Sequence, residues 1–219
     1  MEQFSITERN KVRRIPKRGQ YDKATVYEIL DSAFVAHVGF SIDGQPFVIP
    51  TAYGRKDDVI YLHGASTSRM LVALKEQAQP ICITVTHLDG IVVARSSFHS
   101  SMNYRSAVVF GKGELVEGEE KMEALEIITE NILKGRWEEA RQPKPNEMKA
   151  TAVLKVTIEQ ASAKIRTGGA SDDKADEALP IWAGVLPIKQ IYEAPIPDTL
   201  LAETTEVPES IQRIFAKES

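Results

Sequence analysis

The segment YLHGASTSRM (residues 61–70) places a histidine, three hydroxyl side chains and an arginine close together in the chain. The pattern predicts a strand that ends near His63, then a turn through small residues, and a helix that begins near Ser66–Ser68. The free N–H groups at a helix start attract phosphate, and Arg69 can add a bidentate cation. Helix capping alone would explain one hydroxyl, but not three beside an arginine. We therefore interpret this segment as an anion-binding site.

A second polar cluster, RSSFHSSMNYRS (residues 95–106), contains two arginines, a histidine, a tyrosine and five serines. Serine and asparagine favour turns, so the segment is typical of a surface loop. It leads directly, however, into the apolar residues AVVFG. We therefore expect Tyr104, Arg105 and Ser106 to lie at the mouth of a barrel.

A third group combines KIRTGG (residues 164–169) with IWAGVLP (residues 181–187). Trp182 stands beside Ala-Gly, where its ring can stack on a planar ligand or pack into a subunit interface. A place in the protein core explains the tryptophan equally well, and the sequence leaves these alternatives open.

Other chemical motifs are not supported. Residues 111–113 (GKG) lack the spacing of a phosphate-binding loop, and residues 64–68 (GASTS) lack the second glycine of a nucleophile elbow. The four histidines form no helical i, i+4 pair, so no metal site is expected. Cys82 lies in an apolar segment and is expected to be an inert, buried thiol.

Charge and composition narrow the class of protein. The chain of 219 residues has a net charge of −4, but residues 1–23 carry seven basic and three acidic groups, so the remainder has a net charge of −8. An acidic body argues against nucleic-acid binding. A single cysteine, no secretory signal and no apolar run of about 20 residues favour a cytoplasmic protein without a membrane partner. The basic N-terminal residues are either a solvated terminus or a segment that docks on an anion or on a partner subunit.

Short strands and Asp-Gly turns dominate the expected secondary structure. Strands are expected at about 34–41, 46–53, 59–63, 104–116 and within 152–167, and helices at 21–32, 68–77 and 119–134. Asp43-Gly44 and Asp57-Asp58 are expected turns, and a further hairpin is expected to turn at Asp89-Gly90. The expected fold is therefore mainly β, an antiparallel barrel covered by a few helices.

The order of these segments resembles the pyridoxamine 5′-phosphate oxidase-like FMN-binding split-barrel family, in the flavin-nucleotide-binding branch that contains the nitroimidazole-resistance reductases. The segments that carry the resemblance are RRIPKRGQYD, GQPFVIPTAYGR, YLHGASTSRM, ICITVTHLDG, ARSSFHSSMNYRSAVVFGKGE, KIRTGG and IWAGVLP. The resemblance spans roughly residues 11–190 and implies a six-stranded antiparallel split barrel. It also implies a homodimer with FMN in two clefts at the subunit interface. The implied parts are a basic arm (1–20), an FMN-binding domain (21–194) and a surface-wrapping tail (195–219).

The resemblance also implies which residues contact FMN. Grouped by segment, they are His63, Gly64, Ser68 and Arg69 around the phosphate; Val48, Pro50 and Thr51 along the isoalloxazine; Thr84 and Thr86 on the next strand; Tyr104, Arg105 and Ser106; and Arg166 and Trp182 from the other subunit. His63 is also the candidate catalytic residue, because histidine can deliver a proton near working pH.

Two departures from the family pattern bear on activity. Ser68-Arg69-Met70 stands where pyridoxamine phosphate oxidases carry Ser-Arg-Lys, and their C-terminal substrate-binding arginine and histidine have no clear counterpart. Both argue against oxidation of pyridoxamine phosphate itself. The resemblance implies an FMN-dependent oxidoreductase that acts on an unidentified small molecule. The alternatives are a flavin store or sensor without turnover, and a split barrel that holds haem or a deazaflavin.

Overall fold

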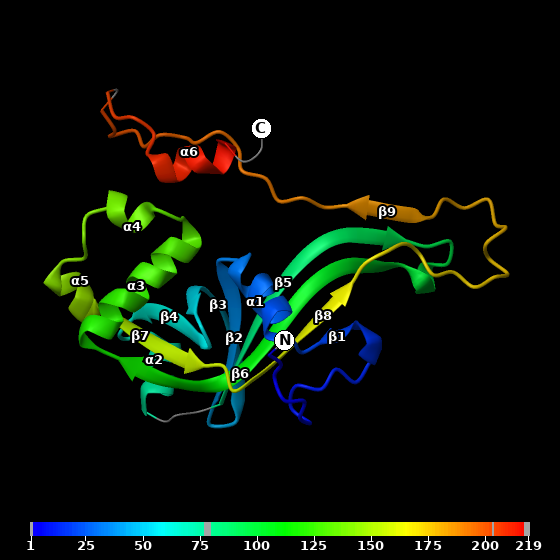
Figure 1. Ribbon diagram of the computed structural model, residues 1–219, viewed down its shortest axis with the longest axis horizontal. Coiled ribbons are helices and arrows are strands. Elements are labelled where there is room, and N and C mark those ends of the chain that lie inside the picture. Colours follow the sequence, from blue (N-terminus) through cyan, green and yellow to red (C-terminus); the bar gives the residue numbers. More distant parts are fainter. Residues whose placement is uncertain (1, 77–79, 203, 217–219) are drawn as a thin grey trace.

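A computed structural model describes residues 2–76, 80–202 and 204–216. Six antiparallel strands form a closed ring, in the order β2 (Val35–Ile42), β3 (Gln45–Lys56), β4 (Val59–Ala65), β7 (Thr151–Thr157), β6 (Ser101–Val116) and β5 (Pro80–Val93). Pairing of β5 with β2 completes the ring. The fold is thus mainly β, and the predicted six-stranded antiparallel split barrel is confirmed (Figure 1).

Two of the predicted turns join neighbouring strands of the ring. Asp43 and Gly44 have φ angles of 51° and 79° between β2 and β3. Asp57 has a φ of 51° between β3 and β4. Aspartate and glycine tolerate this left-handed conformation, so local sequence determines both hairpins.

Helices α1 and α2 fill the barrel from different sides (Figure 1). Helix α1 (Lys23–Asp31) begins where the Asp22 carboxylate accepts a hydrogen bond of 2.9 Å from the backbone N–H of Thr25. Helix α2 (Arg69–Glu76) matches the predicted helix, whose expected last residue, 77, lies outside the described residues. The apolar faces of both helices join the barrel core, through Val26, Ile29 and Leu30 of α1 and Met70, Leu71 and Leu74 of α2.

Helix α3 (Gly118–Ile132) lies outside the ring, against β3 and β4. Its side chains Lys121, Ala124 and Ile128 are buried, whereas Ile132, the last residue of the helix, is 44% exposed. The helix approaches the sheet closely. A Cβ at Gly54 would lie 2.7 Å from the carbonyl oxygen of Ile127, so the helix backbone rests directly on the sheet there.

Strands β5 and β6 extend beyond the ring as a curved arm (Figure 1). The arm is widened by β8 (Gln160–Arg166), β9 (Gly184–Pro187) and the short β1 (Gly19–Gln20), and η1 (Pro16–Arg18) precedes β1. The hairpin predicted at Asp89-Gly90 is wrong, because β5 runs through these residues with only a bulge. The Asp89 carboxylate is held by Arg105 of β6, and Gly90 lies against the backbone of Leu186 in β9. The chain turns instead at 94–100, around η2 (Ser97–His99).

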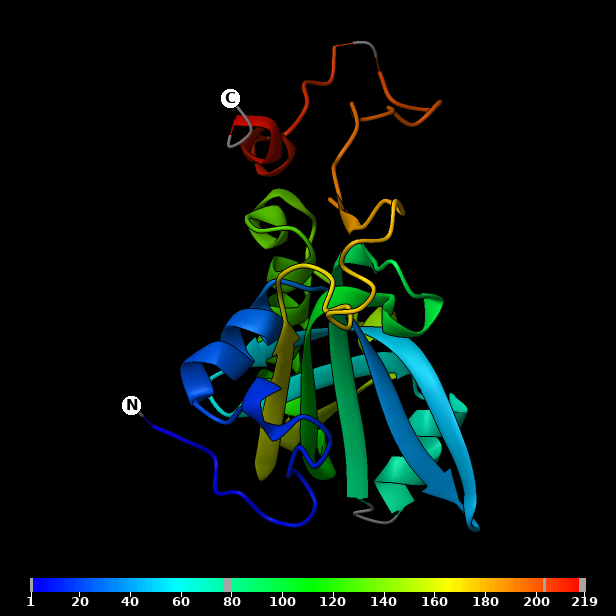
Figure 2. The same ribbon diagram turned by 90° about the vertical axis from the view of Figure 1, so that its right-hand side faces the viewer.

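Both terminal segments lie on the surface of the body. The N-terminal segment is packed rather than solvated: Phe4 is buried, and Asn10 is only 3% exposed and donates to the carbonyl oxygen of Ala161. The C-terminal residues form a separate layer that ends in α6 (Glu209–Ala216), beyond α4 (Arg136–Glu139) and α5 (Pro145–Ala150) (Figures 1 and 2). Residues 203 and 217–219 of the expected tail lie outside the described residues.

No helix among the described residues is long and apolar enough to cross a bilayer.

Candidate functional site

Half of the predicted flavin contacts, seven of fourteen, lie on one face of the sheet. Residues directly opposite in antiparallel strands point to the same side. The register pairs Pro50 with His37, His37 with Thr84, Thr86 with Ser106, and Tyr104 with Arg166. The predicted residues that the register places on this outer face are Val48, Pro50, Thr84, Thr86, Tyr104, Ser106 and Arg166. The outer face is open at β3, where Val48 is 66% exposed.

Strand β3 also has an open edge beside this face. It pairs with β2 along Gln45–Ala52, but with β4 only from Tyr53 onward. Among the described residues, therefore, no strand covers the second edge of residues 45–52. Backbone N–H and C=O groups on such an edge are free to bond a polar ligand.

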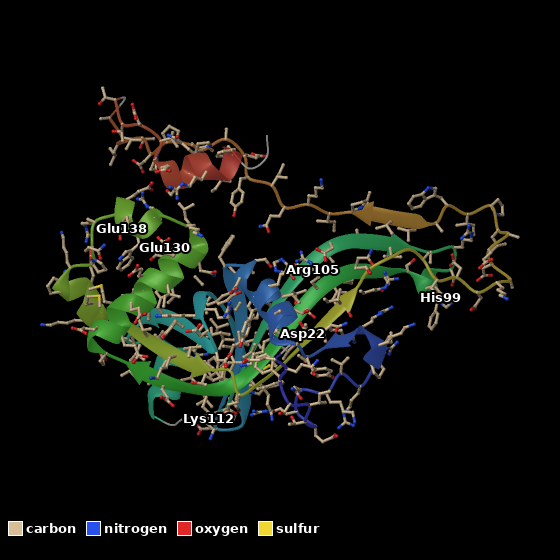
Figure 3. All side chains as sticks on the ribbon, in the orientation of Figure 1. Asp22, His99, Arg105, Lys112, Glu130 and Glu138 are labelled. Carbon is tan, nitrogen blue, oxygen red and sulfur yellow. The ribbon has the colours of Figure 1, made fainter. Side chains whose placement is uncertain are left out.

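Two predicted residues point away from the outer face. Thr51 lies opposite Ala36, which is fully buried, so its side chain faces the barrel interior. Arg105 lies beside α1 (Figure 3) and makes hydrogen bonds of 2.9–3.3 Å with the Asp89 carboxylate. Its hydrogen bonds with Asp89 raise the pKa of Arg105. Arg105 therefore has a partner within the chain. Thr51 can offer only its backbone groups to a ligand at the open edge.

The start of α2 holds the predicted phosphate-binding group. The hydroxyl of Ser68 accepts from the backbone N–H of Leu71 at 3.4 Å, which is the N-cap interaction. Arg69 is exposed, and its guanidinium lies 5.0 Å from the ring centre of Phe47 on β3. Within the described part of the chain, no carboxylate lies within salt-bridge distance of Arg69. The cation therefore stands beside the open edge of β3 with its donors unused.

His63 is separated from that cation. Gly64 packs against Leu71 on the inner side of β4, whereas His63 lies on the outer side, under the helical cap formed by α3, α4 and α5. It lines a cavity of about 550 Å³ there, together with residues of the cap that include Leu125, Trp137 and Met148. The sequence does not reveal this cavity, because its walls come from separate segments, α3, α4, α5 and the start of β7, that only the fold brings together.

The imidazole of His63 has an unusual environment. Its Nδ1 atom is enclosed and has no hydrogen-bond partner in the described part of the chain. Burial lowers the pKa of His63 below its ordinary value of 6.5, so the ring is neutral at neutral pH. A neutral, unpartnered imidazole can donate an electron pair to a metal ion.

Arg166 and Trp182, the contacts predicted to come from the other subunit, both lie on the arm. Arg166 is 6% exposed and donates to the Asn103 side-chain oxygen at 2.5 Å and to the carbonyl oxygen of Gly169 at 3.2 Å. Burial, together with the nearby charge of Arg18, lowers the pKa of Arg166. Trp182, in contrast, is 67% exposed. The structure therefore brings neither side chain to the open edge of β3 in the same chain.

Together, the closed ring of six strands and the arm define a split barrel. The chain belongs to the pyridoxamine 5′-phosphate oxidase family, whose model matches residues 22–165. The match ends before Arg166, so the segment that contains Trp182 and the C-terminal layer lies outside it.

Solved structures extend the similarity over nearly the whole chain. The flavocytochrome Anf3 from Azotobacter vinelandii is 40% identical, with a TM-score of 0.88 over 95% of this chain and 97% of that one. The FAD and heme binding protein from Mycobacterium smegmatis is 35% identical, with a TM-score of 0.86 over 90% and 97%. A putative 5-nitroimidazole antibiotic resistance protein from Bacteroides thetaiotaomicron is 28% identical, with a TM-score of 0.56 over 66% and 84%. No curated protein sequence matches the chain.

Proposed function

We propose that this chain is a flavin-binding redox protein whose flavin lies along the open edge of β3. The observation that carries the proposal is the unused cation of Arg69 beside an uncovered strand edge. Arg69 and the N–H groups at the start of α2 would bind the flavin phosphate. Backbone groups of Pro50 and Thr51 would bond the polar rim of the ring, and Val48 would pack against the ring plane.

The phosphate bound by Arg69 is common to FMN and FAD. The family resemblance favours FMN, whereas a relative that is 35% identical over 90% of this chain is named for FAD. We favour FAD, because that relative matches 90% of this chain, whereas the family model ends at residue 165. Denaturing the purified protein and separating the released flavin by chromatography distinguishes the two. Release of FMN alone would contradict the choice of FAD but not the flavin site.

We further propose that the functional unit is a homodimer. Apolar side chains are exposed along the outer face, the arm and the C-terminal layer, at Val48, Leu88, Ile91, Leu186, Ile196 and Leu200. Contiguous exposed apolar surface marks an interaction site, and a second copy of this chain would cover it. Trp182 on the arm would then reach the partner's flavin. Light scattering of the purified protein should give the mass of a dimer, and the mass of a monomer would refute this assembly.

A bound flavin supplies electron transfer in steps of one or two electrons. The chain's own residues would bind the phosphate and orient the ring. We propose an oxidoreductase that acts on a small molecule, with no proton-transfer role for His63, whose ring lines a separate cavity. The purified yellow protein should be reduced by NADH or NADPH and reoxidised faster than free flavin. Failure of both steps with flavin bound would favour a flavin store or sensor.

The haem alternative has a specific observation in its favour. Two relatives at 40% and 35% identity are named as a flavocytochrome and as a FAD and heme binding protein. His63 offers an unpartnered imidazole at a cavity apart from the open edge of β3. We therefore propose haem as a second prosthetic group beside flavin. An absorption spectrum of the purified protein separates flavin bands from a Soret band.

A further inference from the structure

His63 stands out among the buried polar groups of the described chain. The enclosed Nδ1 atom makes no hydrogen bond, and its ring has no other hydrogen-bond partner among the described residues. A buried polar atom without a partner costs free energy, so its persistence needs an explanation, such as a missing ion or ligand. The ring lines the cavity under α3, α4 and α5, so a ligand in that cavity can reach it.

The cavity is chemically suited to a large, flat, apolar ligand that carries acidic groups. Its volume of about 550 Å³ lies within the usual range for small-molecule and cofactor sites. Leu125, Trp137 and Met148 give it apolar walls, and its charged lining consists of Arg136 and Arg141 with Glu139 and Glu147. Arg141 is hydrogen-bonded to Glu147 at 2.6 and 2.9 Å, whereas the nearest carboxylate oxygen to Arg136 is 3.9 Å away, on Glu139. Arg136 is therefore the cation with donors to spare.

The other histidines do not offer the same combination. His87 is within hydrogen-bond distance of the Ile29 carbonyl and of Ser32, at 3.2 and 3.0 Å. His99 lies at the tip of the arm (Figure 3), 3.5 Å from the Asp173 carboxylate. His37 is exposed in the middle of the outer face. His63 combines an enclosed, unpartnered ring nitrogen with a place in the wall of a cavity.

We infer that this cavity binds haem, an iron porphyrin, and that a ring nitrogen of His63 is an axial ligand of the iron. The inference rests on the proposed function, which includes haem as a second prosthetic group. It adds where the haem binds and which residue coordinates its iron. Arg136 is placed to bind a propionate of the porphyrin, while the apolar walls enclose the ring.

The position of His63 also relates the two prosthetic groups. The register of β3 with β4 ends at Tyr53 and Leu62, which are both fully buried, so the next residues along, Ala52 and His63, both point to the outer face. Pro50, on the proposed flavin edge, is two residues from Ala52 on the same strand and points to the same face. The proposed haem cavity and the proposed flavin edge are therefore separate sites on the same outer face of the ring.

Haemin titration of the purified, flavin-loaded protein tests the inference. The wild-type protein should bind one haemin per chain and show the Soret band and electron paramagnetic resonance signal of a histidine-ligated haem. His63→Ala should lose that signature and keep its flavin, and added imidazole should restore it by filling the space of the missing side chain. His99→Ala removes a histidine at the arm tip and should behave like the wild type. Leu125→Trp leaves His63 in place but fills the cavity, and should block haemin uptake.

The outcomes separate this inference from the proposed flavin function. A His63→Ala variant with an unchanged haem spectrum would overturn the inference, because the iron would have another ligand. A wild-type protein that binds flavin but no haemin would also overturn it and would leave the flavin function standing. A wild-type protein that binds haemin through His63 but no flavin would support the inference and overturn the flavin function. Rescue by imidazole shows that the variant is folded.

Discussion

Replacement of Arg69 by alanine removes the one charged group proposed to bind the flavin phosphate. Its guanidinium has no carboxylate partner in the described part of the chain, and its one aromatic contact is the Phe47 ring at 5.0 Å. An exposed cation–π contact contributes about 0.5–1 kcal/mol, so the free energy of unfolding should change little. A charge-assisted hydrogen bond contributes about 1.5–3 kcal/mol, so flavin affinity should fall roughly tenfold to a hundredfold.

Titration of the flavin-free protein with FAD, followed by quenching of flavin fluorescence, measures this change. Arg14→Ala is the matched control, because it removes the same charge from an exposed position near the N-terminus. Urea unfolding of both variants separates loss of binding from loss of fold. If Arg69→Ala binds FAD as tightly as the wild type and the Arg14→Ala control, the phosphate is bound elsewhere and the proposed site is refuted.

Three further predictions concern the framework around the two sites. Gly54→Ala should destabilise the protein by about 1–3 kcal/mol, because a Cβ would meet the α3 backbone at 2.7 Å; Gly169→Ala, with open space around it, should have almost no effect in urea unfolding. Tyr53→Phe should cost about 1–1.5 kcal/mol, because the buried hydroxyl donates to the carbonyl of Leu30, and an unchanged unfolding midpoint would contradict this. Burial lowers the pKa of His63 in the folded state. The contribution of His63 to the free energy of unfolding of the cofactor-free protein should therefore be complete above the ordinary pKa of 6.5 and be lost as the pH falls below that value. His63→Leu should lack that loss between about pH 7 and pH 5, and equal pH profiles of both proteins would disprove the assignment.

The barrel could be predicted from the sequence because its determinants are local. Alternating apolar residues define the strands, and Asp43-Gly44 adopts the positive φ angles that a tight hairpin needs. The same dipeptide at Asp89-Gly90 misleads for a physical reason. There Arg105 holds the aspartate and β9 lies against the glycine, so distant segments keep the strand extended. Local sequence cannot reveal contacts between segments so far apart in the chain.

The candidate site, like the fold, could be predicted from the sequence only in part. Arg69 and the hydroxyls before it form one short segment, so their anion-binding chemistry could be inferred from residue types alone. The cavity at His63 could not, because its walls come from three helices that only the packing of α3 on Gly54 brings over β4. The likeness to the family likewise named Arg105 as a flavin contact, whereas the strand register places it on the face beside α1, bonded to Asp89.

A crystal structure of the flavin-loaded protein tests the central claim most directly. We predict that the flavin phosphate lies within hydrogen-bond distance of Arg69 and the start of α2, with the ring along Val48–Thr51. A flavin bound with its phosphate away from Arg69, or with another strand along its ring, would contradict the account.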